Sequence, residues 1–133
     1  MILLDTHVLL WWQAGGERLS ARAARAIADA EAVLVSPVTC WEVASLMVKG
    51  RIALDRDVYR WVADLLSGEH VSLAPLSAQA AVGAALLPSV SFPGDPADRL
   101  LYATARELVV PFVTKDGQIR DYARQAKDVR TLW

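Results

Sequence analysis

Short apolar runs alternate with amphipathic or alanine-rich stretches along the chain. Residues 2–4 are Ile-Leu-Leu, a run too short for a helix, which predicts a buried strand ending at Asp5. Further strands are predicted at residues 31–36, 70–75, 109–116 and 129–133, and helices at 6–12, 20–30, 37–49, 58–66, 77–87, from 96 onward, and 118–127. Strands that alternate with helices are typical of a parallel sheet of the α/β class. Pro111 is unusual for the interior of a central strand.

Two aspartates lie where a Pro/Gly-containing loop leads into a helix, in the sequence Gly94-Asp95-Pro96-Ala97-Asp98. Asp95 is a good helix N-cap and Pro96 suits the first helical position. Residues three apart share a face of a helix, so both carboxylates could also point to one spot beside the helix N-terminus. Local sequence therefore leaves a capping role and a metal-binding role open.

Three other acids have comparable positions. Asp5 and Asp116 each end an apolar run, and Glu42 lies among largely apolar neighbours on a helix that follows a strand. Asp5 and Glu42 also have simple structural explanations, a helix cap for Asp5 and a solvent-facing position for Glu42. In a parallel α/β sheet, however, strand C-termini and the following helix N-termini lie at one edge. The acids are therefore expected to meet there.

Several carboxylates at one edge would repel one another unless a cation offset their charge. Ligand sets made only of oxygen favour Mg²⁺ or Mn²⁺, which pair naturally with phosphate groups. Such a site can bind a phosphodiester and activate a water molecule for in-line attack. The acids therefore predict metal-assisted phosphodiester chemistry.

Composition limits the other possibilities. With 133 residues, of which 54% are hydrophobic, the chain is expected to form one domain, residues 1–133, with a substantial core. A single cysteine, Cys40, excludes an internal disulfide. The net charge of −1 gives no general attraction for nucleic acid, so such binding must be local or metal-assisted. No run is long enough to span a membrane and no secretory leader is evident, so a cytoplasmic protein is expected.

Four stretches together resemble the PIN-domain ribonucleases of the VapC toxin type. They are residues 3–12 (Leu-Leu-Asp-Thr-His-Val-Leu-Leu-Trp-Trp), 36–42 (Ser-Pro-Val-Thr-Cys-Trp-Glu), 95–105 (Asp-Pro-Ala-Asp-Arg-Leu-Leu-Tyr-Ala-Thr-Ala) and 113–116 (Val-Thr-Lys-Asp). The resemblance covers nearly the whole chain, and the order and spacing of the pieces make it specific. It implies a three-layer sandwich with a central parallel sheet flanked by helices. It also implies an Mg²⁺-dependent endoribonuclease, the toxin of a toxin–antitoxin pair, with Mn²⁺ as a substitute.

The resemblance also implies roles for individual residues. Asp5, Glu42, Asp98 and Asp116 would form the catalytic acidic quartet that binds metal, with Asp95 as an additional acid. Thr6 and Thr114 would support the site. Many relatives carry Ser or Asn where His7 stands, so His7 is assigned no role.

Partners are implied as well. The resemblance implies an RNA substrate, a homodimer and a cognate antitoxin whose peptide fills a hydrophobic groove. Five tryptophans are more than a small core readily hides, and adjacent tryptophans on a helix cannot both face the core. The apolar residues expected to contact the antitoxin are Trp11, Trp12, Trp41, Leu46 and Met47.

Three other functional classes are alternatives to this interpretation. A Mg²⁺-dependent phosphatase with an aspartyl nucleophile typically has a second Asp two residues after the first, where this chain has His7. A nucleotide-binding module is disfavoured because no Gly-rich phosphate loop follows the first strand. A non-catalytic PIN-like protein that binds RNA or another protein is the remaining alternative, and the complete set of acids argues against it.

Overall fold

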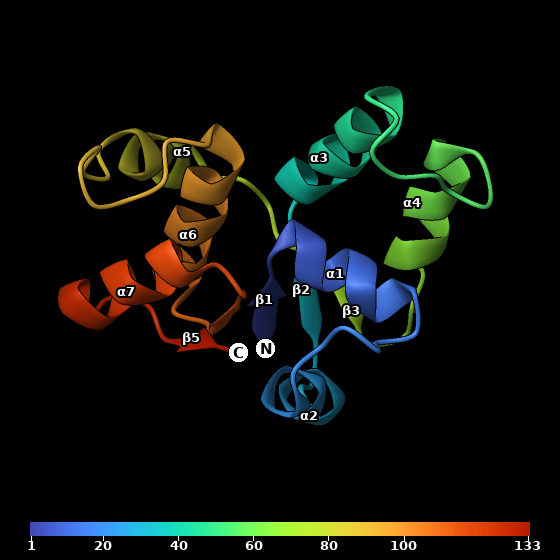
Figure 1. Cartoon of the computed structure of the whole chain (residues 1–133), viewed down its shortest axis with the longest axis horizontal. Coiled ribbons are helices and arrows are strands. Elements are labelled where there is room, and N and C mark those ends of the chain that lie inside the picture. Colours follow the sequence, from blue (N-terminus) through green and yellow to red (C-terminus); the bar gives the residue numbers. More distant parts are fainter.

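A computed structural model describes all residues, 1–133, and shows a five-stranded parallel sheet between two layers of helices (Figure 1). The strands are β1 (Ile2–Leu4), β2 (Val33–Val35), β3 (Val71–Leu73), β4 (Phe112–Val113) and β5 (Thr131–Leu132). The helices are α1 (Thr6–Gln13), α2 (Ala21–Asp29), α3 (Pro37–Val48), α4 (Val58–Leu66), α5 (Ala78–Ala85), α6 (Pro96–Leu108) and α7 (Gly117–Ala126). The predicted three-layer α/β sandwich is confirmed.

The sheet has the order β3-β2-β1-β4-β5, with Leu3 paired to Leu34 on one side and to Phe112 on the other. The chain runs outward from β1 through β2 to β3 and then returns to add β4 and β5 on the opposite side. The direction of winding therefore changes between β1 and β4. In open α/β sheets, ligands bind at the carboxyl ends of the strands beside such a switch point.

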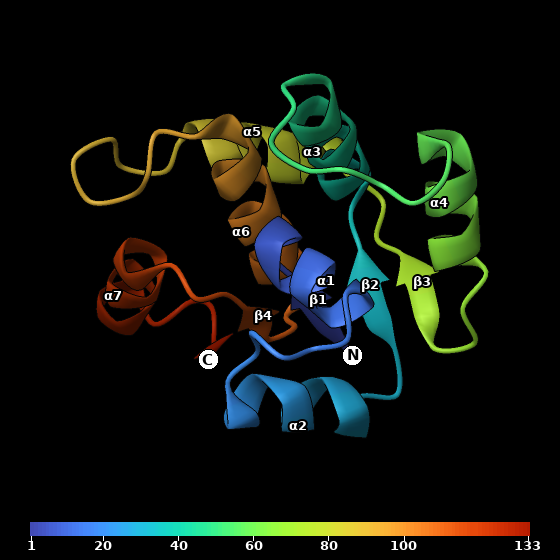
Figure 2. The same ribbon diagram turned by 45° about the vertical axis from the view of Figure 1, so that its right-hand side comes forward.

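Side chains alternate across the sheet and form two cores. Leu3, Leu34 and Phe112 face a core that α6 and α7 close, and Ile2, Leu4 and Val33 face a core closed by α1, α2 and α4. Figure 2 shows α2 on the opposite side of the sheet from α5. Burial of both faces explains why these strands are continuous apolar runs rather than alternating sequences.

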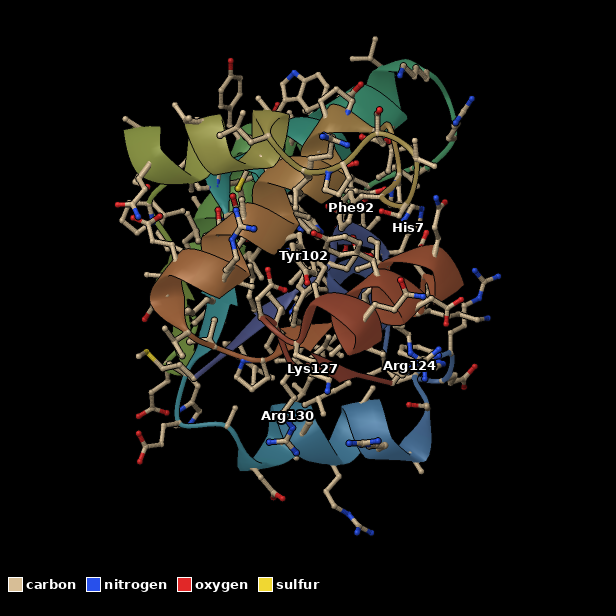
Figure 3. The ribbon with its side chains drawn as sticks, turned by 90° about the vertical axis from the view of Figure 1, so that its left-hand side faces the viewer. His7, Phe92, Tyr102, Arg124, Lys127 and Arg130 are labelled. Atoms are coloured by element: carbon tan, nitrogen blue, oxygen red, sulfur yellow. The ribbon has the colours of Figure 1, made fainter.

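Aromatic residues anchor the first core. Phe92, Tyr102 and Tyr122 make three edge-on contacts with ring centroids 5.0–5.6 Å apart, and Phe92 and Tyr102 lie close to α6 and α7 in Figure 3. The Tyr102 hydroxyl donates to Asp128 Oδ1 at 2.5 Å, which satisfies its polar end. Aromatic pairs of this kind stabilise a fold by about 0.5–1.5 kcal/mol beyond the effect of the area they bury. The three aromatic contacts fix α6, the helix that carries Asp98, against α7.

The predicted strand at residues 109–116 proved shorter than expected. Val109 has φ 54° and is the C-cap of α6, and only Phe112–Val113 pair as a strand. The β-branched run misled the prediction because helix α6 continues further than its sequence suggests, and Pro111 then separates the cap from the ladder.

Candidate metal centre at the carboxyl edge of the sheet

Five acids gather at the carboxyl edge of the sheet, and we call them the acidic edge. They are Asp5, Glu42, Asp95, Asp98 and Asp116. The charges of the other four acids all raise the pKa of Asp98. The structure therefore brings together every acid that the sequence predicted for this edge.

Asp5 is held rigidly at the end of β1. It is 8% exposed, its Oδ1 accepts from the Thr6 backbone N–H at 2.7 Å, and its Oδ2 accepts from the Thr114 hydroxyl at 2.7 Å. Burial raises the pKa of Asp5, the hydrogen bonds partly offset this rise, and nearby His7 lowers the pKa further. Thr114 is itself fully buried. Its position agrees with the supporting role that the family resemblance implies.

Asp116 lies on the other side of the switch point, after β4. Its Oδ1 accepts from the Ile119 N–H at 2.9 Å and so caps α7, while its own N–H donates to Thr114 Oγ1 at 3.1 Å. Thr114 thus connects the two strand-end aspartates. One carboxylate oxygen of Asp116 has no part in the cap.

Glu42 is brought to the edge by a buried hydroxyl pair. The Thr6 hydroxyl donates to Glu42 Oε1, and Thr39 Oγ1 lies 3.4 Å from Thr6 Oγ1. Burial raises the pKa of Glu42, the Thr6 hydrogen bond lowers it, and Asp5 and Asp95 raise it. Thr39 was not among the predicted site residues. Thr39 lies three residues before Glu42, so both side chains are on one face of α3, and this spacing could have identified Thr39 as a site residue.

Asp95 and Asp98 differ in their contacts. Asp95 has extended backbone geometry, with φ −62° and ψ 120°, and its Oδ1 accepts from the Ala97 N–H at 2.9 Å. The predicted cap is confirmed. The Asp98 carboxylate makes no hydrogen bond. Burial together with the surrounding carboxylates raises the pKa of Asp98 to about 8. A charged Asp98 is therefore costly to the fold without a cation.

Arg99 organises the loop that carries these two acids. Its guanidinium donates to the carbonyls of Ala84, at 3.0 Å, Pro93, at 3.2 Å, and Leu87. It also lies 5.8 Å from the centre of the Phe92 ring. Although it follows Asp98 directly, Arg99 pairs with no acid. It ties the end of α5 to the start of α6, a role that sequence adjacency alone gave no reason to expect.

No member of the acidic edge forms an ion pair. The ion pairs of the protein join Arg56 with Asp55 and Asp64, Arg60 with Asp64, Arg106 with Asp128, and Arg124 with Asp121. The helix N-termini capped by Asp5, Asp95 and Asp116 place positive helix-dipole ends here, which offsets only part of the negative charge.

The donor set fits a hard divalent cation. No three acidic, histidine or cysteine side chains are close enough together to enclose a metal ion. A closed cage is not what Mg²⁺ requires, since it keeps several waters and is usually held by one or two carboxylates. Carboxylates that converge without closing therefore suit a hydrated ion next to a phosphate.

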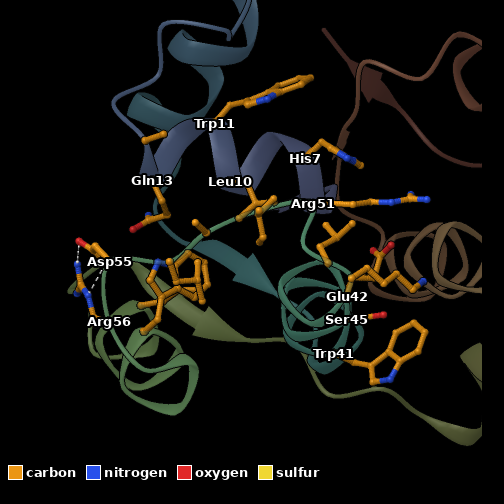
Figure 4. A pocket seen from close by; sticks show the side chains of 18 of the residues that line it. His7, Leu10, Trp11, Gln13, Trp41, Glu42, Ser45, Arg51, Asp55 and Arg56 are labelled. Carbon is orange, nitrogen blue, oxygen red and sulfur yellow. Dashed lines mark hydrogen bonds and ion pairs between the residues drawn. The ribbon is translucent and has the colours of Figure 1, made fainter.

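A groove of about 1120 Å³ opens beside the acidic edge between α1, α3 and α4. Figure 4 shows His7, Leu10 and Trp11 on α1, with Trp41, Glu42 and Ser45 on α3. Three residues of the predicted antitoxin surface, Trp11, Trp41 and Leu46, line this groove; Met47 and Trp12 do not, and Trp12 instead packs against the second core.

The comparisons with known proteins agree with this geometry. The sequence model of the PIN-domain family matches residues 2–125 of this chain. The chain belongs to the PIN-domain family. It is 43% identical over 132 residues to the Mycobacterium tuberculosis (strain ATCC 25618 / H37Rv) protein "Ribonuclease VapC22", covering 99% of this chain and 98% of that one.

Solved structures share the fold. A Mycobacterium tuberculosis VapC20, described as a sarcin-ricin loop cleaving toxin, has a TM-score of 0.64 at 19% identity, covering 92% of this chain and 95% of that chain. A toxin-antitoxin complex from Klebsiella pneumoniae has a TM-score of 0.60 at 19% identity, covering 87% of each chain. No helix of this PIN-domain protein is long and apolar enough to cross a membrane.

Proposed function

We propose that this chain is a metal-dependent endoribonuclease, the toxin of a toxin–antitoxin pair, and that Mg²⁺ is its cofactor. The observation that carries the proposal is the acidic edge: five carboxylates from three helices and a strand end converge beside the switch point, and none has a cationic partner. The 43% identity to a ribonuclease over nearly the whole chain supports the same activity.

The proposed roles follow from the contacts. Asp5, Glu42, Asp98 and Asp116 would hold the cation, and Asp95 would add negative charge while it caps α6. When bound, the cation would offset phosphodiester charge and make water a better nucleophile at neutral pH, and Mn²⁺ could replace it. Thr114 fixes the Asp5 carboxylate and Thr6 fixes that of Glu42. These two threonines orient the acids as outer-shell partners do in metal sites generally.

The experiment that tests this proposal is RNA cleavage by the Asp5→Asn protein. Asn keeps the shape of the side chain and removes the charge, so cleavage should be lost while the fold survives. Wild-type cleavage should require Mg²⁺ or Mn²⁺ and stop in chelator. Asp64→Asn, which changes an acid outside the acidic edge, is the matched control and should cleave normally. Undiminished cleavage by Asp5→Asn, or by the wild type in chelator, would overturn the proposed metal site, and absence of cleavage by the metal-loaded wild type would favour a non-catalytic role.

We further propose that an antitoxin peptide occupies the groove between α1, α3 and α4. Trp41 is 64% exposed although it is a large aromatic residue, and it lines the groove together with Leu46 and Glu42. A helical peptide with apolar anchors suits such a surface, and an Arg from it could pair with the acidic edge. In a complex with the protein encoded by the adjacent reading frame, Trp41→Ala should weaken binding without changing RNA cleavage. Equal binding by the variant and the wild type would exclude this groove.

The family resemblance also leads us to propose a cytoplasmic homodimer. Sedimentation of the purified protein should give twice the monomer mass. A monomer across the concentration range would exclude the dimer.

A further inference from the structure

Four residues beside the acidic edge form a continuous aromatic and cationic surface, which we call the stacking strip. Its members are His7, Trp11, Lys115 and Trp133. The rings of Trp11 and Trp133 have centroids 5.8 Å apart at an angle of 54°, and the His7 ring lies 6.1 Å from that of Trp11. Lys115 Nζ is 5.7 Å from the centre of the Trp11 ring. Residues from α1, from the loop after β4 and from the chain after β5 therefore meet at one place.

The two adjacent tryptophans of α1 have different surroundings. Trp12 packs against the second core, whereas Trp11 belongs to neither core and is half-buried. Figure 4 shows the Trp11 indole and the His7 imidazole extending from α1 toward the same side of the helix. The core does not require an indole at position 11, so the Trp11 side chain is available for a role other than core packing.

The Lys115 ammonium has no partner other than the Trp11 ring. Lys115 lies between Thr114 and Asp116, both of them residues of the site, and yet it is exposed and takes part in none of the ion pairs. In a chain of net charge −1, a cation next to Asp116 and free of ion pairs is a local means of attracting a phosphate.

We propose that the stacking strip binds single-stranded RNA next to the scissile phosphate. A base would stack against Trp11 or Trp133, and Lys115 would contact a neighbouring phosphate. Flat aromatic surfaces interspersed with cations suit nucleotides, since every base has a π-face and each linkage carries a negative charge. The strip adjoins the acidic edge because His7 is two residues from Asp5 and Lys115 is next to Asp116. This inference rests on the proposed ribonuclease activity and adds its substrate contacts.

The test measures binding of a short fluorescent single-stranded RNA to protein that also carries Asp98→Asn, so that the RNA stays intact. Trp11→Ala and Trp133→Ala should each weaken binding about 10-fold, as expected when one base loses its stacking partner. Trp133→Phe should retain most of the affinity, which separates stacking from loss of fold. Lys115→Gln should lower the slope of log affinity against log salt concentration by about one. Tyr59→Ala changes an exposed aromatic residue of α4 that belongs neither to the strip nor to the groove, so it is the matched control and should bind RNA normally.

In protein that retains Asp98, the strip variants should raise KM far more than they lower kcat, because the strip does not touch the reacting atoms. Unchanged RNA affinity in both tryptophan variants would overturn the proposal. It would also be overturned if those variants lost only affinity for the antitoxin, because the surface would then belong to a protein partner. Wild-type protein that binds RNA at the strip without cleaving it would contradict the proposed function alone.

Discussion

Two groups of acids border the same groove, and the fold provides a cationic partner for one group but not for the other. At one end, Arg56 lies between Asp55 and Asp64, with N–O distances of 2.8 and 2.7 Å, and this contact lowers the pKa of Asp55. At the other end, the acidic edge has no ion pair, and the pKa of Asp98 is raised to about 8. The paired acids are exposed, so solvent screens them and they contribute little to stability.

The difference separates structural from functional charge. Asp55 and Asp64 share a cationic partner, whereas the acidic edge, which includes buried Asp5 and half-buried Asp98, has none, and this uncompensated charge destabilises the metal-free fold. Strongly shifted pKa values in a cluster near a cleft are typical of functional sites. Removing charge at the two ends should therefore have different consequences.

The largest effect is expected for Asp98→Asn. Loss of this carboxylate should reduce RNA cleavage by more than about 100-fold, beyond the loss typical of an outer-shell residue. Asp64→Asn, in the paired group, should leave cleavage unchanged. Cleavage rates at saturating RNA, with circular dichroism as a check on the fold, measure both. Similar activity of the two variants would remove the distinction between the two groups.

Thr114→Val should have the next largest effect. Valine matches the shape of threonine but leaves Asp5 Oδ2 without its hydrogen-bond donor. Cleavage should fall about 10–100-fold, and the metal concentration for half-maximal activity should rise. Thr104→Val is a suitable control, because that hydroxyl is equally buried but bonds only to the Leu100 carbonyl. Equal losses in the two variants would point to packing rather than to the orientation of Asp5.

Arg99→Lys should have an intermediate effect. Lysine keeps the charge but cannot reproduce the fork that reaches the Ala84, Leu87 and Pro93 carbonyls. Metal affinity, read from the rise in melting temperature with Mn²⁺, should fall about 10-fold as the Asp98 loop loosens. Arg106→Lys, on the same helix but bonded to Asp128, should change stability without changing metal affinity. A shift of the same size in both variants would reduce Arg99 to a general stabilising role.

The smallest effect on cleavage is expected at Asp95. Asp95→Asn can still cap α6 and should retain substantial activity, whereas Asp95→Ala should lower the free energy of unfolding by about 1 kcal/mol. Denaturant unfolding and cleavage rate, measured together, distinguish the cap from the metal role. If Asp95→Asn were as inactive as Asp98→Asn, Asp95 would belong with the metal ligands.

Much of this arrangement was predictable from sequence, because local rules determine it. Asp5 and Asp116 end short apolar runs and Asp95 precedes Pro96, so strand ends and a helix cap placed three of the five acids. The sequence does not specify the contacts that only tertiary packing creates. The Arg99 fork depends on where α5 ends, and the Thr6–Glu42 contact depends on how α1 crosses α3.

The tryptophans show the same limit. Adjacency at positions 11 and 12 predicted that both could not face the core, but it did not show which one does. The rotation of α1 decides this, since Val8, Leu9 and Trp12 face the second core and Trp11 turns outward. Of the five residues predicted to contact an antitoxin, Trp11, Trp41 and Leu46 line the groove.

We propose that the acidic edge, whose negative charge the fold leaves uncompensated, holds a divalent cation. Asp98 has a pKa of about 8 in the folded protein against 3.8 as its ordinary value, so the folded state binds this proton more tightly. Metal-free protein should therefore lose stability as pH rises from about 4 to about 8.

The most direct test is the melting temperature of the wild type and of Asp98→Asn at about pH 8, in chelator and then with Mg²⁺ or Mn²⁺. In chelator, Asp98→Asn should melt higher than the wild type, because it lacks the repelled charge. Added metal should raise the melting temperature of the wild type much more than that of the variant. A variant that melts no higher in chelator, and that gains as much from metal as the wild type does, would contradict the account.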